Sequence, residues 1–194
     1  MDAASSTVDA KTLATLAVTL PDTDGIAHNL SEFAAAGPAV VVYARGAWCP
    51  YCLRQLADYA ERYAEFRQAG AEIVAVSPES PRRSRRLRTQ LKLPFTVLSD
   101  SRFEAAKVLG LLSREKPGEP TPATLLLDRQ RGVTMSTLNQ REKSVVAVDM
   151  LDYVREARQL NILAAIPVLS VTTPKPGILF ARALVNLATG IFVH

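Results

Sequence analysis

Two cysteines three positions apart are the residues of this chain best suited to chemistry. Cys49 and Cys52 lie in the segment Trp48-Cys49-Pro50-Tyr51-Cys52, after a β-branched run and before a segment with helical spacing. On the first turn of a helix, residues three apart share a face, so the two sulfurs come within bridging distance. A thiolate at a helix N-terminus is stabilised by unpaired N–H groups and by the helix dipole. The spacing therefore predicts thiol–disulfide chemistry.

The two cysteines have different expected roles. Cys49 is nearer the helix terminus and is the predicted nucleophile. Cys52, one turn further and more buried, is predicted to resolve the intermediate into a disulfide. Pro50 suits the first helical position, where a missing N–H has no partner to lose. The other interpretations are an inert buried pair or half of a metal site, and the strand–WCxxC–helix context favours the redox pair.

Composition limits the other classes of function. The chain has 194 residues, 48% hydrophobic and 22% charged, which fits one globular domain with an appendage and needs no disulfide lattice. A structural zinc site takes about four ligands. The only histidines are His28 and His194, so no metal is expected. A net charge of +4 is too small for a dedicated nucleic-acid binder, so no nucleic acid is expected as a partner.

The first ten residues contain two aspartates and lack the basic start and apolar stretch of a signal peptide. We therefore expect a cytoplasmic protein. The longest uncharged stretch, Gln159–Pro174, is short for a bilayer and contains Pro167, so no transmembrane span is expected.

Hydrophobic patterning predicts strands that alternate with helices. A strand at 13–20, a turn at Asp24-Gly25, a returning strand at 26–30 and a short helix precede the central part. Further strands are expected at 39–43, 71–77, 95–98, 123–128 and 133–137, and helices at 53–66, 81–91, 103–109 and 144–160. This order predicts an α/β layered fold with a mostly parallel centre and a closing hairpin.

The segment AVVVYARGAWCPYC resembles the active site of thioredoxin-fold proteins, and its Cys-Pro-Tyr-Cys core is also that of glutaredoxins. Those folds place a cis-proline opposite the reactive cysteine, just before a strand, and Pro122 in TPATLL matches that element. Between Cys49 and Pro122 there is room for two strand–helix units, where thioredoxin has one.

The added unit, LPFTVLSDSRFEAAKVLGL, resembles a peroxiredoxin segment. Thr96 stands where that pattern has a proline, while Leu98-Ser99-Asp100 keeps its end. PATLLLDRQRG resembles the following strand and turn. The resemblance covers about residues 12–158 and is closest to the peroxiredoxin-like branch of the alkyl hydroperoxide reductase/thiol-specific antioxidant (AhpC/TSA) family. It implies a thioredoxin-like fold: a mixed central sheet flanked by helices.

The resemblance also implies an antioxidant activity. A Cys49 thiolate would attack a hydroperoxide and become a sulfenic acid, and Cys52 would condense with it to a disulfide. A thioredoxin- or glutathione-type thiol reductant would reduce the pair, with no cofactor. Two alternatives stay open: reduction of protein or glutathione disulfides, and a redox sensor without turnover.

The chain departs from the Pro-x-x-x-Thr-x-x-Cys signature of typical peroxiredoxins, because Val42 and Gly46 hold the proline and threonine positions. The family's threonine hydroxyl helps to hold the peroxide, so that contact is missing here. Arg45 is expected either to offer its guanidinium near the sulfur or to point to solvent. Trp48 is expected to be a lid beside Cys49 or to fill the core.

Other candidate residues follow from their positions. The resemblance implies that the Thr121 backbone pairs with a bound thiol substrate. Ser77 and Glu79, after the second core strand, are expected at the edge of the site. His28 is predicted to be a satisfied structural histidine.

Two further segments carry weaker expectations. The arginines between Arg82 and Arg88 are predicted to form a solvated helix face, the alternative being docking of an acidic partner such as a reductase. Residues 161–194 are expected to be an apolar, helical extension of a redoxin domain at 1–160. An apolar stripe through Phe180, Leu184, Leu187 and Ile191 favours packing on its own domain or in a homodimer over a membrane surface.

Overall fold

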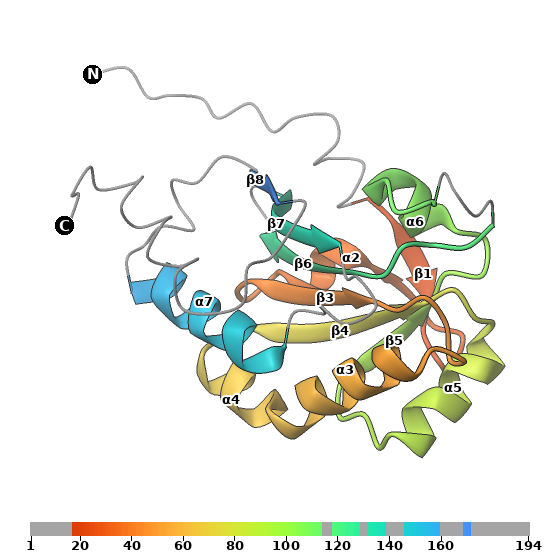
Figure 1. Ribbon diagram of the computed structural model, residues 1–194, viewed down its shortest axis with the longest axis horizontal. Coiled ribbons are helices and arrows are strands. Elements are labelled where there is room, and N and C mark those ends of the chain that lie inside the picture. The colour runs from red at the N-terminus through yellow and green to blue at the C-terminus, as the bar shows by residue number, and fades with distance from the viewer. Residues whose placement is uncertain (1–16, 114–117, 129–131, 139–145, 160–168, 172–194) are drawn as a thin grey trace.

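The described part of the chain is built on a six-stranded mixed sheet with helices on both faces (Figure 1). The structure, a computed structural model, describes residues 17–113, 118–128, 132–138, 146–159 and 169–171. The strand order is β5-β4-β3-β6-β7-β8. The strands are β3 (Ala39–Tyr43), β4 (Glu72–Ser77), β5 (Thr96–Ser99), β6 (Ala123–Asp128), β7 (Gly132–Leu138) and β8 (Leu169–Val171). Strands β3, β4 and β5 run parallel, and β6 runs antiparallel to both β3 and β7, which confirms the predicted mixed sheet.

Helices cover the sheet in two sets (Figure 1). One face carries α3 (Pro50–Glu61), α4 (Tyr63–Gln68), α5 (Pro81–Gln90) and α7 (Ala147–Gln159). The other carries α2 (Leu30–Phe33), α6 (Glu104–Leu109) and the small hairpin of β1 (Thr19–Pro21) and β2 (Ala27–Asn29).

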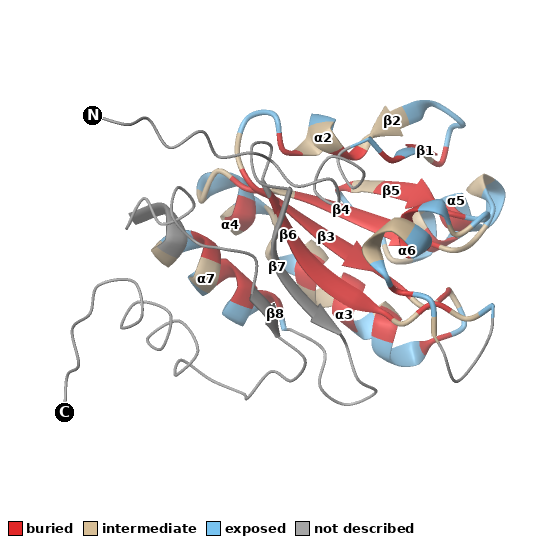
Figure 2. Cartoon of the chain, turned by 90° about the horizontal axis from the view of Figure 1, so that it is seen from above, coloured by how far each residue is buried: buried red, intermediate tan, exposed pale blue. Residues whose placement is uncertain are grey.

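The continuous apolar run of β3 is explained by burial on both faces. Val40 and Val42 join the core under α3, α5 and α7, whereas Val41 and Tyr43 join the core under α2 and α6. Figure 2 shows β3 as buried throughout. A strand enclosed on both sides holds the segment that follows it, the Cys49 loop, on a rigid base.

Two elements depart clearly from the sequence prediction. The helix begins at Pro50, as predicted, but it is divided at Arg62, whose φ of −101° and ψ of 7° interrupt it between α3 and α4. Gly70, which follows the C-cap of α4 with a φ of +73°, ends this helical segment. Within the extension at 161–194, β8 pairs in parallel with β7, so these three residues join the sheet and are not helical. Their apolar–polar–apolar order suits a strand.

Other predictions for the extension, including the apolar stripe from Phe180 to Ile191, lie outside the described residues. Among the described residues, no helix is long and apolar enough to span a bilayer.

One arginine of the run from Arg82 to Arg88 connects two elements of the fold. Arg85 donates two hydrogen bonds to the carbonyl oxygen of Thr23, at 2.9 and 2.6 Å, and pairs with Asp24 at 3.1 Å. Arg85 is exposed, as predicted for a solvated helix face, and it also ties α5 to the turn of the β1–β2 hairpin. His28 lies between Asp22 and Glu32, at 3.2 and 3.3 Å, as expected of a satisfied structural histidine.

Candidate active site

The loop after β3 delivers Cys49 to the start of α3. The Ala44 N–H donates to the Val76 carbonyl at 2.9 Å, which extends the β3–β4 pairing by one residue. The chain then turns, and the Cys49 N–H donates to the Gly46 carbonyl at 3.2 Å. Cys49 is consequently the N-cap residue of α3, with extended backbone angles (φ −89°, ψ 108°).

The Cys49 sulfur takes the place that a serine or aspartate oxygen holds in most N-caps. The Cys52 N–H donates to Cys49 Sγ at 3.4 Å, and Pro50 occupies the first turn. Both cysteines are free thiols and each is 3% exposed. A thiolate at Cys49 would meet an N–H donor and the positive end of the helix dipole.

Cys52 is held as a protonated thiol. Burial, and then its hydrogen bond with the Cys49 thiol, raise the pKa of Cys52 to about 12, against the lowering effect of the Arg45 N–H that it accepts at 3.4 Å. The environments of the two sulfurs therefore differ in the direction expected of a nucleophile and a resolving thiol. Within the described residues, no group of three or more His, Cys, Asp or Glu side chains is placed to hold a metal ion.

Trp48 lies at the surface beside the cysteine pair. It is 60% exposed, so the core-filling alternative is wrong. The Arg45 guanidinium lies over the indole ring, 5.8 Å from its centroid. The charge of Arg45 also acts to lower the pKa of Cys52, against the larger effect of burial.

One expectation about the loop before β6 is wrong. No peptide bond in the described residues is cis, so Pro122 does not follow a cis bond. The Thr121 N–H donates to the Leu111 carbonyl at 2.6 Å, which leaves only the carbonyl of its backbone for the predicted pairing with a thiol substrate. This bond and a bridge between Leu112 and Pro120 fix the approach to β6, with Pro122 in the ordinary trans form.

Pro122 nevertheless lies near the cysteine loop. Its neighbour Ala123 pairs with Tyr43 at the end of β3, from which the loop to Cys49 departs. Pro122 therefore has the predicted position, whereas the predicted cis geometry is wrong.

Glu79 contacts the turn that carries Cys49, whereas Ser77 is buried at the end of β4. Glu79 Oε1 accepts the Ala47 N–H at 3.4 Å, and Oε2 pairs with Arg83 at 3.2 Å. Ser77 is 1% exposed inside β4. Glu79 thus supports the turn that carries Cys49.

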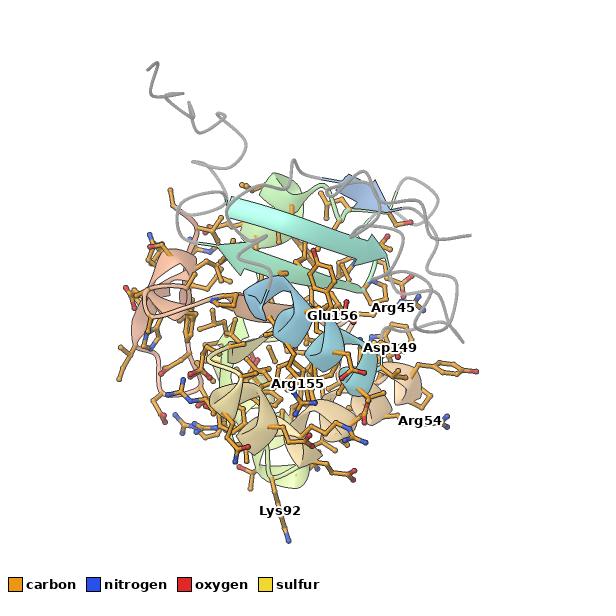
Figure 3. All side chains as sticks on the ribbon, turned by 90° about the vertical axis from the view of Figure 1, so that its left-hand side faces the viewer. Arg45, Arg54, Lys92, Asp149, Arg155 and Glu156 are labelled. Carbon is orange, nitrogen blue, oxygen red and sulfur yellow. The ribbon has the colours of Figure 1, made fainter. Side chains whose placement is uncertain are left out.

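Gln55 was not among the residues predicted to support the site. This side chain is buried one turn after Cys52 and donates to Thr124 Oγ1 of β6 at 2.9 Å, which links α3 to the sheet below the cysteines. Its neighbour Arg54 projects outward (Figure 3). The sequence does contain a signal for this role, because Gln55 is a polar residue on the apolar face of the helix, one turn beyond Cys52.

A cysteine pair at the start of a helix that follows a central strand, in a mixed sheet, defines a thioredoxin-like thiol protein. The model of the AhpC/TSA family matches residues 14–136. The chain belongs to this family.

Known relatives agree with that assignment. Peroxiredoxin Q of Suaeda salsa chloroplasts is 34% identical over 125 residues, 64% of this chain and 58% of the relative. Peroxiredoxin Q of Sedum lineare is 35% identical over 123 residues, 63% of this chain and 65% of the relative. The chain therefore spans less than two thirds of these relatives.

Solved peroxiredoxins share the fold. Peroxiredoxin Q of Xanthomonas campestris has a TM-score of 0.63 at 21% identity, covering 76% of this chain and 93% of that one. AhpC of Enterococcus faecalis has a TM-score of 0.66 at 15% identity, covering 78% and 93%.

Proposed function

We propose that this protein is a thiol-dependent peroxidase that reduces hydroperoxides through Cys49 and a Cys49–Cys52 disulfide. The observation that carries the proposal is the asymmetry of the pair. Cys49 caps α3 and accepts the Cys52 N–H, whereas the Cys52 thiol stays protonated. This asymmetry suits Cys49 to be the nucleophile and Cys52 to be the thiol that later forms the disulfide.

The reaction takes two steps at the sulfurs. The Cys49 thiolate attacks the terminal oxygen of the hydroperoxide, the O–O bond breaks, and the departing alkoxide takes a proton from solvent to leave as an alcohol. Cys49 is then a sulfenic acid. The Cys52 thiol condenses with it, which forms the disulfide and releases water. A dithiol reductant restores both thiols by exchange.

The relatives support a peroxide substrate. The matched curated proteins are peroxiredoxins, and one similar Xanthomonas campestris structure was described in terms of alkyl peroxide reduction. Those descriptions concern the relatives, and the proposal extends them to this chain.

Gly46 favours a second candidate function, the reduction of protein or glutathione disulfides. A glycine at this position offers no hydroxyl to a peroxide, while attack of Cys49 on a disulfide sulfur requires none. The same two thiols would serve that exchange.

The remaining features of the proposal come from the sequence. The reductant is a thioredoxin-type dithiol or two molecules of a glutathione-type thiol, the compartment is the cytoplasm, and the protein pairs as a homodimer. Size measurement in solution and fractionation of cells test the last two.

The deciding experiment compares peroxide consumption with disulfide reduction, each driven by dithiothreitol, for the wild type, Cys49→Ser and Cys52→Ser. We expect the wild type to consume hydroperoxide and Cys49→Ser to lose that activity. Turnover of disulfides without peroxide consumption would establish the second candidate instead. Turnover of neither, with oxidation altering affinity for a partner, would indicate a sensor.

A further inference from the structure

Two exposed aromatic side chains flank the buried nucleophile. Cys49 is 3% exposed, whereas its neighbour Trp48 is 60% exposed and Tyr51, in the first turn of α3, is 39% exposed. Tryptophan and tyrosine side chains are enriched at the centres of protein–protein interfaces. A thiol that reaches Cys49 from another molecule therefore approaches beside these two rings.

Arginines follow the ends of three parallel strands at the same edge of the sheet. Strands β3, β4 and β5 run parallel, so their carboxyl ends meet at one edge. Arg45 follows β3, Arg82 lies in the first turn of α5 after β4, and Arg102 follows β5. Arg82 and Arg102 are exposed. This edge, which also carries Cys49, is therefore rich in positive charge.

The first turn of α5 is joined to the turn that carries Cys49. Glu79 Oε1 accepts the Ala47 N–H at 3.4 Å, and Glu79 lies just before Pro81, where α5 begins. Glu79 Oε2 pairs with Arg83 at 3.2 Å, so its negative charge is compensated by α5 itself. Figures 1 and 2 place α5 at the end of the sheet where β3 and β4 end. The arginines at the start of α5 therefore lie next to the cysteine loop.

Helix α5 contains five arginines and no acidic residue. Arg83 and Arg85 form ion pairs within the chain. Arg82 and Arg86 are four residues apart on the helix and share a ridge. Both are exposed, and within the described residues neither has a carboxylate partner. Their guanidinium groups are free to bind carboxylates of another molecule.

We propose that this aromatic and basic surface docks the protein dithiol that reduces the Cys49–Cys52 disulfide, and that acidic residues surround the thiols of that reductant. The residues of this docking surface are Trp48, Tyr51, Arg82, Arg86 and Arg102. The assignment rests on the proposed function, which requires a thiol reductant in every cycle. A nucleic acid or an anionic membrane also carries negative charge, but neither supplies the electrons that a disulfide takes up.

The exchange takes two steps. A thiolate of the reductant attacks Cys49 Sγ, the Cys49–Cys52 bond breaks, and Cys52 leaves and takes a proton from solvent. The second thiol of the reductant loses its proton to solvent and attacks its own partner sulfur in the mixed disulfide, and Cys49 leaves as a thiolate. The reductant is thereby oxidised to a disulfide. Carboxylates bound to Arg82 and Arg86 hold it in place during both steps.

The test measures reduction of the preformed disulfide in the full chain, after oxidation by diamide and removal of the excess. The reductants are two synthetic Cys-Gly-Pro-Cys peptides that differ only in carrying glutamates or glutamines beside the thiols. Because glutamates also change the acidity of the peptide thiols, the ratio of the two rate constants is compared between proteins. At low ionic strength we expect this ratio to be about fivefold lower in Arg82→Gln/Arg86→Gln than in the wild type. The difference should vanish in about 1 M salt, where charges are screened.

Lys92→Gln/Lys107→Gln is the matched control, because it removes the same net charge away from the docking surface. Lys92 projects away from the molecule beyond α5, and Lys107 is exposed on α6, on the opposite face of the sheet (Figure 3). This control should keep the wild-type ratio. Trp48→Ala should slow reduction by both peptides without changing the ratio, since an aromatic contact does not depend on the charge of the peptide.

The same ratio in the wild type and in Arg82→Gln/Arg86→Gln would overturn the inference and leave the proposed function intact. An equal fall in the lysine control would also overturn it, because net charge would then set the rate. Binding of a DNA duplex that requires Arg82 and Arg86, with no effect on the ratio, would assign these arginines to nucleic acid instead. If diamide formed no Cys49–Cys52 disulfide, the proposed function would fail, and this inference with it.

Discussion

The two sulfurs differ because their immediate contacts differ. Cys49 Sγ accepts a hydrogen bond from the Cys52 N–H at the N-terminus of α3. Cys52 is buried beside Cys49, and its sulfur accepts a hydrogen bond from the Arg45 N–H. The spacing of the cysteines and the place of Pro50 in the helix could be predicted from local sequence, because helix geometry determines both. The position of the Trp48 ring and the use of the Thr121 N–H could not, since both depend on segments distant in sequence or on packing of the folded loop.

The pKa of Cys52 leads to a prediction about alkylation. Because burial raises this pKa to about 12, Cys52 should remain protonated and unreactive at neutral and mildly alkaline pH. Native wild type treated with iodoacetamide should gain one adduct, on Cys49, and Cys49→Ser should gain none until the protein is unfolded. Intact-mass measurement checks this. Equal labelling of both cysteines in the native protein would refute the assigned asymmetry.

At the scale of elements, the site depends on what fixes α3 and the ends of the parallel strands. Gln55 bonds to Thr124 in β6, and Asp58 accepts the N–H of Ala147 at the start of α7 at 2.7 Å. On the opposite face, Asp100 accepts the Tyr43 hydroxyl at 2.7 Å and caps α6 through the N–H groups of Glu104 and Ala106. The predicted alternation gave the order of these elements correctly, but their side-chain ties cross long sequence distances.

Asp100 does not contact the cysteines, and Asp100→Ala should destabilise the fold as a whole. The change removes a buried acceptor and leaves the Tyr43 hydroxyl and two helix N–H groups unpaired. The expected loss is about 2–4 kcal/mol of unfolding free energy. Urea unfolding measures it, with exposed Arg54→Ala as a control expected to change little. A loss below about 0.5 kcal/mol would contradict the role given to Asp100.

Asp149 at the start of α7 gives a pH-dependent prediction (Figure 3). Burial, then the charges of Asp152 and Asp58, raise the pKa of Asp149 above its ordinary value of 3.8. A raised folded-state pKa means that folding favours the protonated form, so its favourable contribution is complete in acid and is lost as pH rises through that pKa.

Asp149→Asn should therefore be more stable than the wild type at neutral pH, by about 0.2–0.5 kcal/mol as for one like-charge helix pair. The difference should disappear in acid, below the unfolded pKa, and shrink in high salt. Thermal unfolding of both proteins across pH provides the comparison. A variant that is less stable at neutral pH would show that the helix dipole outweighs the neighbouring carboxylates.

On the scale of the whole molecule, a hydrophobic core packs on each face of the sheet. Arg85 of α5 links the N-terminal β1–β2 hairpin to the helices on one face. The class of fold was predictable because the apolar run of β3 and the regular alternation of elements require a doubly covered sheet. The strand β8 was not predictable from the sequence. Its three residues are too few for their hydrophobic alternation to distinguish an edge strand from other apolar structure.

Arg85→Ala should loosen the hairpin while the sheet remains intact. The variant loses two hydrogen bonds to Thr23 and the pair with Asp24, all partly exposed. We expect a loss of about 0.5–1.5 kcal/mol in the hairpin's local stability. Hydrogen exchange in residues 19–29 should accelerate, and exchange in β3 should not. Uniform acceleration across both regions would instead indicate that Arg85 supports the fold as a whole.

The central claim is that Cys49 is the sulfur that a hydroperoxide oxidises, with Cys52 as its partner. The most direct measurement treats Cys52→Ser with one equivalent of hydroperoxide and traps sulfenic acid with dimedone, followed by peptide mass analysis. The account predicts a dimedone adduct on Cys49 in that variant, and an intramolecular disulfide with no adduct in the wild type. An unmodified Cys49 in Cys52→Ser, after hydroperoxide has been consumed, would contradict it.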